Sequence, residues 1–233
     1  MKIFHIVSLF PEAFKSYFDA SLIKKARDKK IISVKIHNPR IFSRDKHKTV
    51  DDKPYGGGPG MVMKIDVIIR AVINVLNEIN KKTNRTDITV RTSRTKIILL
   101  SPSGKQFTQK TARDFAKKYQ NIVFICGHYE GIDSRLKKIL KDIGVKIKEI
   151  SIGPYILGGG ELAAMVIVDA VSRHIPGVLG KIESLEENKG SYPVYTRPEV
   201  FEYKSKKYRV PKVLLGGNHR KISEWRAKHG KII

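Results

Sequence analysis

Short apolar runs alternate with amphipathic segments through most of the chain. Apolar runs typical of buried strands cover residues 3–9, 31–36, 97–100, 122–126 and 145–150. Segments with apolar residues three or four positions apart, which predict helices, cover residues 10–26, 65–76, 108–118, 132–142, 162–173 and 219–228. Strands that alternate with helices pair in parallel, so the pattern predicts an α/β fold built on a parallel sheet.

Three of the predicted strands are followed by loops that contain glycine. These loops cover residues 101–104, 127–131 and 151–161, and the last reads S-I-G-P-Y-I-L-G-G-G-E. The loops after parallel strands meet at one edge of the sheet, where open α/β folds bind ligands. Glycine also lets a ligand or another backbone approach closely. We therefore expect the three loops to line one ligand pocket, with plain surface turns as the alternative.

Two polar segments interrupt this pattern. Residues 38–64 include the glycine-rich stretch Val50 to Met61, whose spacing matches neither G-x-G-x-x-G nor the phosphate-binding loop that ends in Gly-Lys-Ser/Thr. A polar segment of this length is typical of a functional loop, and a surface loop with tight turns is the alternative. Residues 77–95 are expected to form a flexible loop that leaves the domain core.

The amino-acid composition indicates that the protein binds a polyanionic partner. The 233 residues include 46 basic and 22 acidic side chains, for a net charge of +24. Such an excess favours nucleic acid, because neutralised phosphates release counterions. A lysine-rich composition without such a partner is the alternative. The single cysteine, Cys126, excludes a disulfide framework and a cysteine-based zinc site. No apolar run has the length of a membrane span, so we expect a cytoplasmic protein without membrane contact.

The carboxyl-terminal part differs from the rest. We expect a first domain over residues 1–179, an interdomain linker over 180–198, and a small, mostly helical, basic domain over 199–233. The basic domain is a candidate for RNA binding, and a solvated basic tail is the alternative. In the helix before the linker, Asp169 and Arg173 lie four positions apart and are expected on one face, where they can pair.

Eight blocks of sequence, in order over nearly the whole chain, resemble the bacterial tRNA (guanine-N1)-methyltransferase family, TrmD. The blocks are V-S-L-F-P-E (7–12), K-H-K-T-V-D-D-K-P-Y-G-G-G-P-G-M (46–61), L-S-P-S-G (100–104), C-G-H-Y-E-G-I-D (126–133), S-I-G-P-Y-I-L-G-G-G-E-L (151–162), S-R-H-I-P-G-V-L-G (172–180), Y-T-R-P-E-V (195–200) and G-N-H (217–219).

The resemblance implies the SPOUT methyltransferase fold, in which the last part of a parallel sheet is threaded into a trefoil knot. It implies a homodimer with its active site at the subunit interface. It also implies transfer of a methyl group from S-adenosylmethionine to N1 of the guanosine 3′-adjacent to the tRNA anticodon, commonly with magnesium. The resemblance assigns no metal-ligating residue.

The resemblance also assigns roles to residues. The cofactor pocket is expected to comprise Leu100, Ser101, Pro102, Gly127, Tyr129, Glu130, Gly131, Ile152, Gly153, Pro154, Tyr155, Ile156, Leu157, Gly159 and Gly160. Deprotonation of guanine N1 needs a base, and the charge that builds on O6 needs a cation. The cation of the family corresponds to Arg173, which favours a catalytic role over a pair with Asp169.

Three positions depart from the family pattern. Asn188 stands where the family has its aspartate base, and Asn does not take a proton at neutral pH. We expect the neighbouring Glu187 to serve as the base, with another carboxylate or weak catalysis as alternatives. Pro154 stands where the family has Asp, and His128 where it has Arg.

Three hypotheses follow from these comparisons. The first is an active tRNA (guanine-N1)-methyltransferase. The second is a catalytically weak or inactive tRNA-binding SPOUT protein, which Asn188 and Pro154 favour. The third is a methyltransferase that acts on another RNA.

Overall fold

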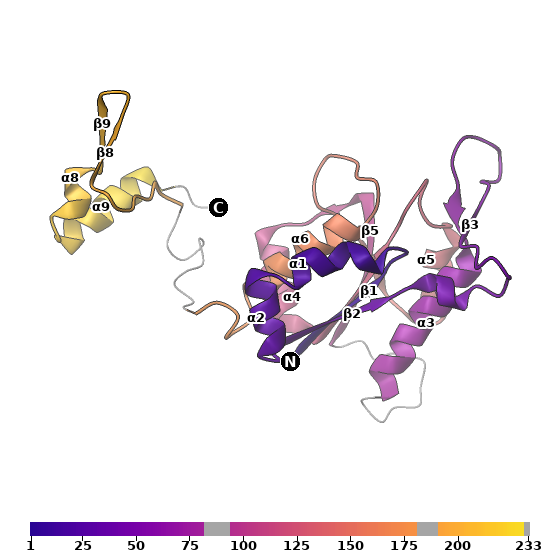
Figure 1. Ribbon diagram of the computed structural model, residues 1–233. Coiled ribbons are helices and arrows are strands. Elements are labelled where there is room, and N and C mark those ends of the chain that lie inside the picture. Colours follow the sequence, from indigo (N-terminus) through magenta and orange to yellow (C-terminus); the bar gives the residue numbers. More distant parts are fainter. Residues whose placement is uncertain (82–93, 181–190, 231–233) are drawn as a thin grey trace. The chain divides into compact units, whose positions relative to one another are not determined.

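The computed structural model describes residues 1–81, 94–180 and 191–230, and the chain forms two compact units, residues 1–179 and 180–233 (Figure 1). The first unit holds a sheet of five parallel strands in the order β2-β1-β6-β5-β7. The strands are β1 (Lys2–Val7), β2 (Ile32–His37), β5 (Thr95–Gln106), β6 (Asn121–Cys126) and β7 (Ile147–Ser151). The predicted parallel sheet is confirmed.

Helices cover both faces of this sheet (Figure 1). They are η1 (Pro11–Phe14), α1 (Lys15–Phe18), α2 (Ser21–Asp28), η2 (Pro39–Phe42), α3 (Ile65–Lys81), α4 (Gln109–Lys118), α5 (Arg135–Asp142) and α6 (Glu161–Ser172). Successive side chains of a strand point to opposite faces. Phe124 of β6 therefore packs in the core with α1, α2, α4 and α6, while Val123 packs in the core with α3 and α5. Both faces of the strand are apolar because both are buried.

Several predicted boundaries differ from the structure. The first predicted helix is divided, because Ala20 is extended and Ser21 has φ +46°. We predicted a flexible segment that begins at residue 77. This start was wrong, because α3 continues to Lys81. Ile79 is buried, so it extends the apolar stripe of Val72, Val75 and Leu76 by another turn. Thr95, at the other end of the predicted segment, belongs to β5, and residues 82–93 lie outside the described part of the chain.

The long polar segment contains regular structure of its own. Besides η2, it contains the antiparallel pair of β3 (Asp51–Asp52) and β4 (Val62–Met63). Val50 is fully buried beside this pair, and the amide of Lys64 donates a 2.7 Å hydrogen bond to its carbonyl. The two ends of the glycine-rich stretch are therefore fastened to the core.

Residues 191–230 of the second unit form a hairpin and two helices. Strands β8 (Val200–Tyr203) and β9 (Lys206–Arg209) pair antiparallel, and α8 (Lys212–Leu215) and α9 (His219–His229) follow. The side chain of Asn218 caps α9 by accepting a 3.1 Å hydrogen bond from the amide of Lys221. Within residues 1–81, 94–180 and 191–230, no helix has the length and apolar character needed to cross a membrane.

Candidate functional site

A cavity of about 420 Å³ lies in the first unit, beside the irregular part of β5 and after the carboxyl ends of β6 and β7. Its wall is formed by residues 99–103 of β5, 127–134 after β6, and 149–160 around the end of β7 without residues 153 and 154, together with Leu136, Lys137 and Ala163. Parts of all three predicted loops therefore line one pocket, as expected. The prediction of a loop at residues 101–104 was wrong, because these residues belong to β5, whose pairing with β7 shifts register between Leu100 and Lys105.

Most of the expected cofactor residues line this cavity. They are Leu100, Ser101, Pro102, Gly127, Tyr129, Glu130, Gly131, Ile152, Tyr155, Ile156, Leu157, Gly159 and Gly160. Gly153 and Pro154 are not among the lining residues. A Cβ on Gly153 would lie 2.2 Å from the Tyr155 ring, so this glycine makes room for the tyrosine. Pro154 is exposed, and the position at which we expected a departure from the family therefore lies outside the cavity wall.

The loop after β6 is hydrogen-bonded to the end of the long polar segment. The amide of Glu130 donates a hydrogen bond to the carbonyl of Met61 at 3.0 Å, and the amide of Met63 donates one to the carbonyl of Gly131 at 2.9 Å. A Cβ on Gly60 would lie 2.3 Å from Oε1 of Glu130. The glycine-rich stretch thus supports the cavity loop, and Gly60 has φ +83°, a backbone conformation that favours glycine.

The glycines at the end of the third loop allow a close backbone approach. The amide of Gly160 donates a 2.9 Å hydrogen bond to the carbonyl of Gly127, and a Cβ on Gly160 would lie 2.8 Å from Cα of Cys126. A Cβ on Gly159 would lie 2.3 Å from Oε2 of Glu161 and 2.5 Å from Nδ1 of His128. The third loop therefore lies directly against the second, and this contact shapes the cavity.

Glu161 is a buried carboxylate beside this contact. Its Oε1 accepts a 2.7 Å hydrogen bond from the hydroxyl of Ser8, and its Oε2 lies 3.9 Å from Nδ1 of His128. Burial, and secondarily the carboxylate of Glu161, raise the pKa of the Cys126 thiol well above its ordinary value. The thiol is therefore a neutral core group. Sequence reasoning missed the role of Glu161, whose only signal was membership of a matched block.

Charged residues that sequence reasoning did not select also line the cavity. Nζ of Lys137 on α5 donates a 2.5 Å hydrogen bond to Oε1 of Glu149 on β7. Hydrogen bonds from Arg135 lower the pKa of Asp133, so this carboxylate is ionised. The cavity wall thus carries the acidic side chains of Glu130, Asp133 and Glu149 and the basic side chain of Lys137. This excess of acidic groups suits a ligand that carries positive charge.

Arg173, the candidate cation, follows the last residue of α6 and is not among the residues that line the cavity. Its amide donates a hydrogen bond to the carbonyl of Asp169 at 3.1 Å. The carboxylate of Asp169 accepts a 2.6 Å hydrogen bond from the hydroxyl of Tyr17, which raises the pKa of Tyr17 to about 12. Glu187 and Asn188, the candidate base positions, lie outside the described residues.

Comparison with known proteins identifies the family. Residues 1–232 match the model of the family described as tRNA (Guanine-1)-methyltransferase TrmD. A tRNA (guanine-N(1)-)-methyltransferase of Dictyoglomus turgidum is 47% identical over 228 residues, which are 96% of this chain and 82% of the relative. The enzymes of the same name from Carboxydothermus hydrogenoformans and Clostridioides difficile are 48% and 45% identical, over 97% and 96% of this chain and 82% and 90% of the relatives. The chain belongs to the tRNA (guanine-N1)-methyltransferase family.

Proposed function

We propose that this protein transfers the methyl group of S-adenosylmethionine to N1 of the guanosine 3′-adjacent to the tRNA anticodon. The observation that carries the proposal is the cavity that three separate family blocks line, one within β5 and the others after β6 and β7. Membership of the family supplies the reaction class.

S-adenosylmethionine fits this cavity in size and chemistry. A volume of about 420 Å³ lies in the usual range of small-molecule pockets, which is roughly 300–1,000 Å³. Leu100, Ile152 and Leu157 offer apolar surface for adenine, and the glycines expose backbone groups that can read its edge. The carboxylates of Glu130 and Glu149 suit the cationic part of the molecule. When bound, the cofactor supplies an electrophilic methyl group.

The rest of the chemistry belongs to residues of the chain. Guanine N1 carries a proton that has to leave as the methyl group arrives. We assign its removal to Glu187, because the amide of Asn188 cannot accept it at neutral pH. We assign to Arg173 the stabilisation of the negative charge that develops on O6.

We further propose a homodimer whose interface includes α6 and the adjoining cavity loop. Leu162 and Val166 lie one turn apart on α6 and are 56% and 48% exposed, and Ile156 on the cavity rim is 85% exposed. Large apolar side chains grouped in this way are typical of an interaction surface. A second subunit on this surface would bring its own residues to the cavity rim.

The second unit is proposed to bind tRNA, with residues 199–233 as the binding domain and 180–198 as the linker, whose Tyr192 and Tyr195 lie against Arg226 and Trp225 of α9. A cavity of about 620 Å³ within this unit is lined by Tyr192, Tyr195, Trp225 and Arg226, among others. The guanidinium of Arg226 lies 4.9 Å from the centre of the Tyr192 ring. Aromatic rings and arginine planes are the groups on which proteins stack unpaired bases.

Three finer features of the family complete the proposal. They are a trefoil knot in the first unit, a requirement for magnesium during transfer, and a cytoplasmic location. The knot is proposed from membership of the family. The magnesium requirement predicts that EDTA stops transfer and that added magnesium restores it.

A second candidate is a tRNA-binding protein that holds tRNA without methylating it. The observation in its favour is the asparagine at residue 188, where the resemblance leads us to expect the family's base. It predicts tRNA affinity without turnover.

Methyl transfer to defined RNAs tests the proposal and separates the alternatives. Purified protein is incubated with labelled S-adenosylmethionine, magnesium and a tRNA transcript that carries G next to the anticodon. We expect label in this transcript, and none in the matched transcript that carries A at that position. Equal labelling of both transcripts would contradict the proposed target atom, and labelling of neither would favour the binding protein.

A further inference from the structure

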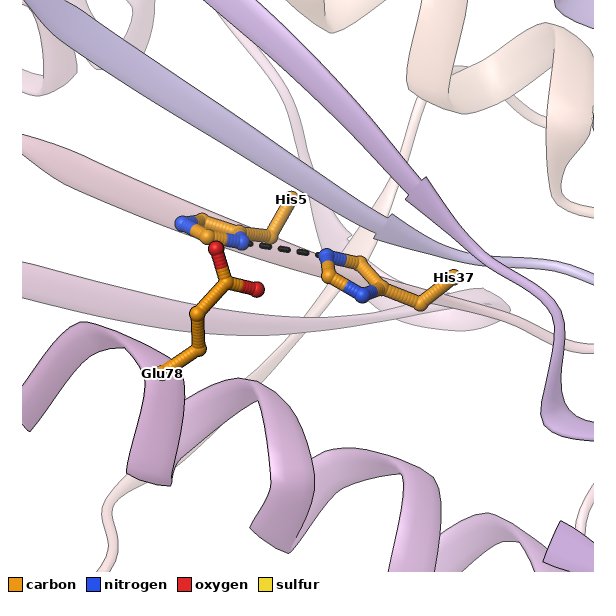
Figure 2. Close-up of side chains that lie close together, drawn as sticks. All are labelled: His5, His37 and Glu78. Carbon is orange, nitrogen blue, oxygen red and sulfur yellow. Dashed lines mark hydrogen bonds between the residues drawn. The ribbon is translucent and has the colours of Figure 1, made fainter. Parts of the chain in front are cut away.

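Two histidines and a glutamate meet on the face of the sheet that α3 covers. His5 lies in β1, His37 ends β2, and Glu78 lies in the last turns of α3. His5 pairs in register with Lys35, which lies two residues before His37, so all three side chains point to one face of the sheet. Figure 2 shows Glu78 reaching from the helix toward the two imidazole rings. One nitrogen of each ring and one oxygen of the carboxylate lie within 4.8 Å of one another.

The spacing of the two rings suits a shared metal ion. Nδ1 of His5 and Nε2 of His37 are 3.1 Å apart, and the rings stack with their centres 5.3 Å apart. Two imidazole nitrogens bound to one tetrahedral zinc, each at about 2.0–2.1 Å, are separated by about 3.3 Å. An ion can therefore bind both nitrogens after a small movement of the side chains.

Binding of an ion between the two rings does not change the number of protons that they carry. Between two neutral rings, the hydrogen bond has one donor and one acceptor. When an ion takes the place of the shared hydrogen, that proton moves by exchange with water to the other nitrogen of the donor ring, which then binds the ion as its other tautomer. Both rings then stay neutral, which is the form that binds metals.

We propose that His5, His37 and Glu78 form a zinc site, with water as the fourth ligand. Two imidazoles and one carboxylate are a donor set typical of Zn²⁺, whereas Mg²⁺ prefers oxygen ligands. His5 is only 2% exposed, but the side chain of Glu78 is about a third exposed, and β2 is an edge strand. The ion and its water can therefore enter from the open side.

Lys35 is the competitor of this ion. Its ammonium donates a hydrogen bond to Oε1 of Glu78, and this contact lowers the pKa of the carboxyl, which is therefore ionised. Burial lowers the pKa of His37, an effect that the nearby Lys35 adds to and Glu78 opposes. The side chain of Lys35 is about a third exposed, so the ammonium can turn toward water when an ion approaches. Removal of this positive charge should strengthen zinc binding.

The site would fasten α3 to β1 and β2. Helix α3 begins directly after β4, whose Met63 is hydrogen-bonded to Gly131 of the cavity loop. None of the three ligands lines that cavity. We therefore assign the ion a structural role, separate from the magnesium proposed for transfer, and its test does not depend on activity.

Zinc and cobalt titrations of the metal-free, full-length chain test the site. Calorimetry should show one equivalent of tightly bound Zn²⁺, and Mg²⁺ at the same concentration should not compete. Co²⁺ should develop the strong visible absorption of a tetrahedral complex, and Zn²⁺ should remove that absorption. Zinc should also raise the melting temperature of the protein.

Four variants separate this site from chance binding to surface histidines. His37→Gln and Glu78→Gln should each weaken zinc binding at least about tenfold, the loss that even outer-shell changes cause. Lys35→Gln should bind zinc more tightly than the parent. His47→Gln, which changes an exposed histidine outside the cluster, should bind as the parent does.

Several results would overturn the proposal. They are the absence of saturable zinc binding, zinc binding that His37→Gln and Glu78→Gln leave unchanged, and weaker binding after Lys35→Gln. Glu78 lies on the partly exposed side of α3, so its variant tests the site even where a histidine variant fails to fold.

Discussion

The hydroxyl of Ser8 donates a 2.7 Å hydrogen bond to Oε1 of Glu161, although the two residues lie 153 positions apart. Both side chains are buried. Ser8 follows β1, and Glu161 is the first residue of α6, directly after the cavity loop. The bond therefore ties two of the blocks that mark the family, V-S-L-F-P-E and S-I-G-P-Y-I-L-G-G-G-E-L, to each other.

Ser8→Ala should lower the free energy of unfolding by about 1.5–3 kcal/mol, the usual contribution of a hydrogen bond to a charged group. The reason is that a buried carboxylate loses a donor. Urea unfolding of parent and variant measures the change. Ser16→Ala, an exposed serine on α1, serves as the control and should change stability by less than about 0.5 kcal/mol. Equal effects of the two substitutions would show that the buried bond contributes nothing.

Gly160→Ala should destabilise the cavity. The new Cβ would lie 2.8 Å from Cα of Cys126 and 3.3 Å from the amide nitrogen of Gly127, so the backbone has to move. Overpacking of this kind typically costs about 1–3 kcal/mol. We expect a lower melting temperature and weaker binding of S-adenosylmethionine by calorimetry.

Gly158→Ala is the matched control, because a Cβ on Gly158 would meet no atom within 4 Å. We expect its melting temperature to match that of the parent. Equal melting temperatures of Gly160→Ala and Gly158→Ala would contradict the close approach of the two loops at Gly160.

Lys2 predicts a dependence of stability on pH. Its side chain is buried and donates hydrogen bonds to the carbonyls of Phe115 and Tyr119. Burial, and secondarily the charge of Arg94, lower its pKa to about 8. Between pH 8 and the ordinary pKa of 10.5, the unfolded chain holds a proton that the folded chain has released. This residue therefore makes the free energy of unfolding rise with pH in that window.

Lys2→Met should remove that rise, while Lys15→Met on the exposed side of α1 should keep it. Denaturant unfolding at pH 8 and pH 10 measures the difference. A parent and a Lys2→Met variant with the same change between these pH values would exclude this account of Lys2.

Arg173→Gln should lower kcat about 10²–10³-fold, the usual effect of losing one group that stabilises developing negative charge. Binding of S-adenosylmethionine should stay unchanged, because Arg173 does not line the cavity. Single-turnover transfer and calorimetry measure the two quantities. Lys110→Gln, an exposed lysine on α4, controls for the loss of one positive charge. A kcat like that of the parent, or an equal loss of cofactor affinity, would argue against the assigned role.

The sheet could be predicted from the sequence because its strands leave a local signal. Both faces of the sheet are covered, so a strand such as β6 reads as an unbroken apolar run from Ile122 to Cys126. The parallel pairing follows from the intervening helices, and the meeting of the three glycine-containing segments at one pocket follows from the pairing. The lining residues were carried over from matched family blocks.

Features that depend on contacts between distant segments could not be predicted in this way. The Ser8–Glu161 bond and the Lys137–Glu149 pair require the placement of a helix end and the rotation of a helix over the sheet. The cluster of His5, His37 and Glu78 requires both the register of β1 with β2 and the position of α3. No local periodicity specifies these relationships.

The central claim is the proposal that this chain transfers a methyl group although we expect Asn188, from the resemblance, at the position of the family's aspartate. Its most direct test is the rate of methyl transfer to tRNA by the parent, Glu187→Gln and Asn188→Asp, at saturating S-adenosylmethionine. We predict transfer by the parent, a loss of at least about 100-fold in Glu187→Gln, as expected for a general base, and a small change in Asn188→Asp. Transfer by the parent that Glu187→Gln leaves unchanged would move the base to another carboxylate. A parent without transfer, together with a large gain in Asn188→Asp, would contradict the claim.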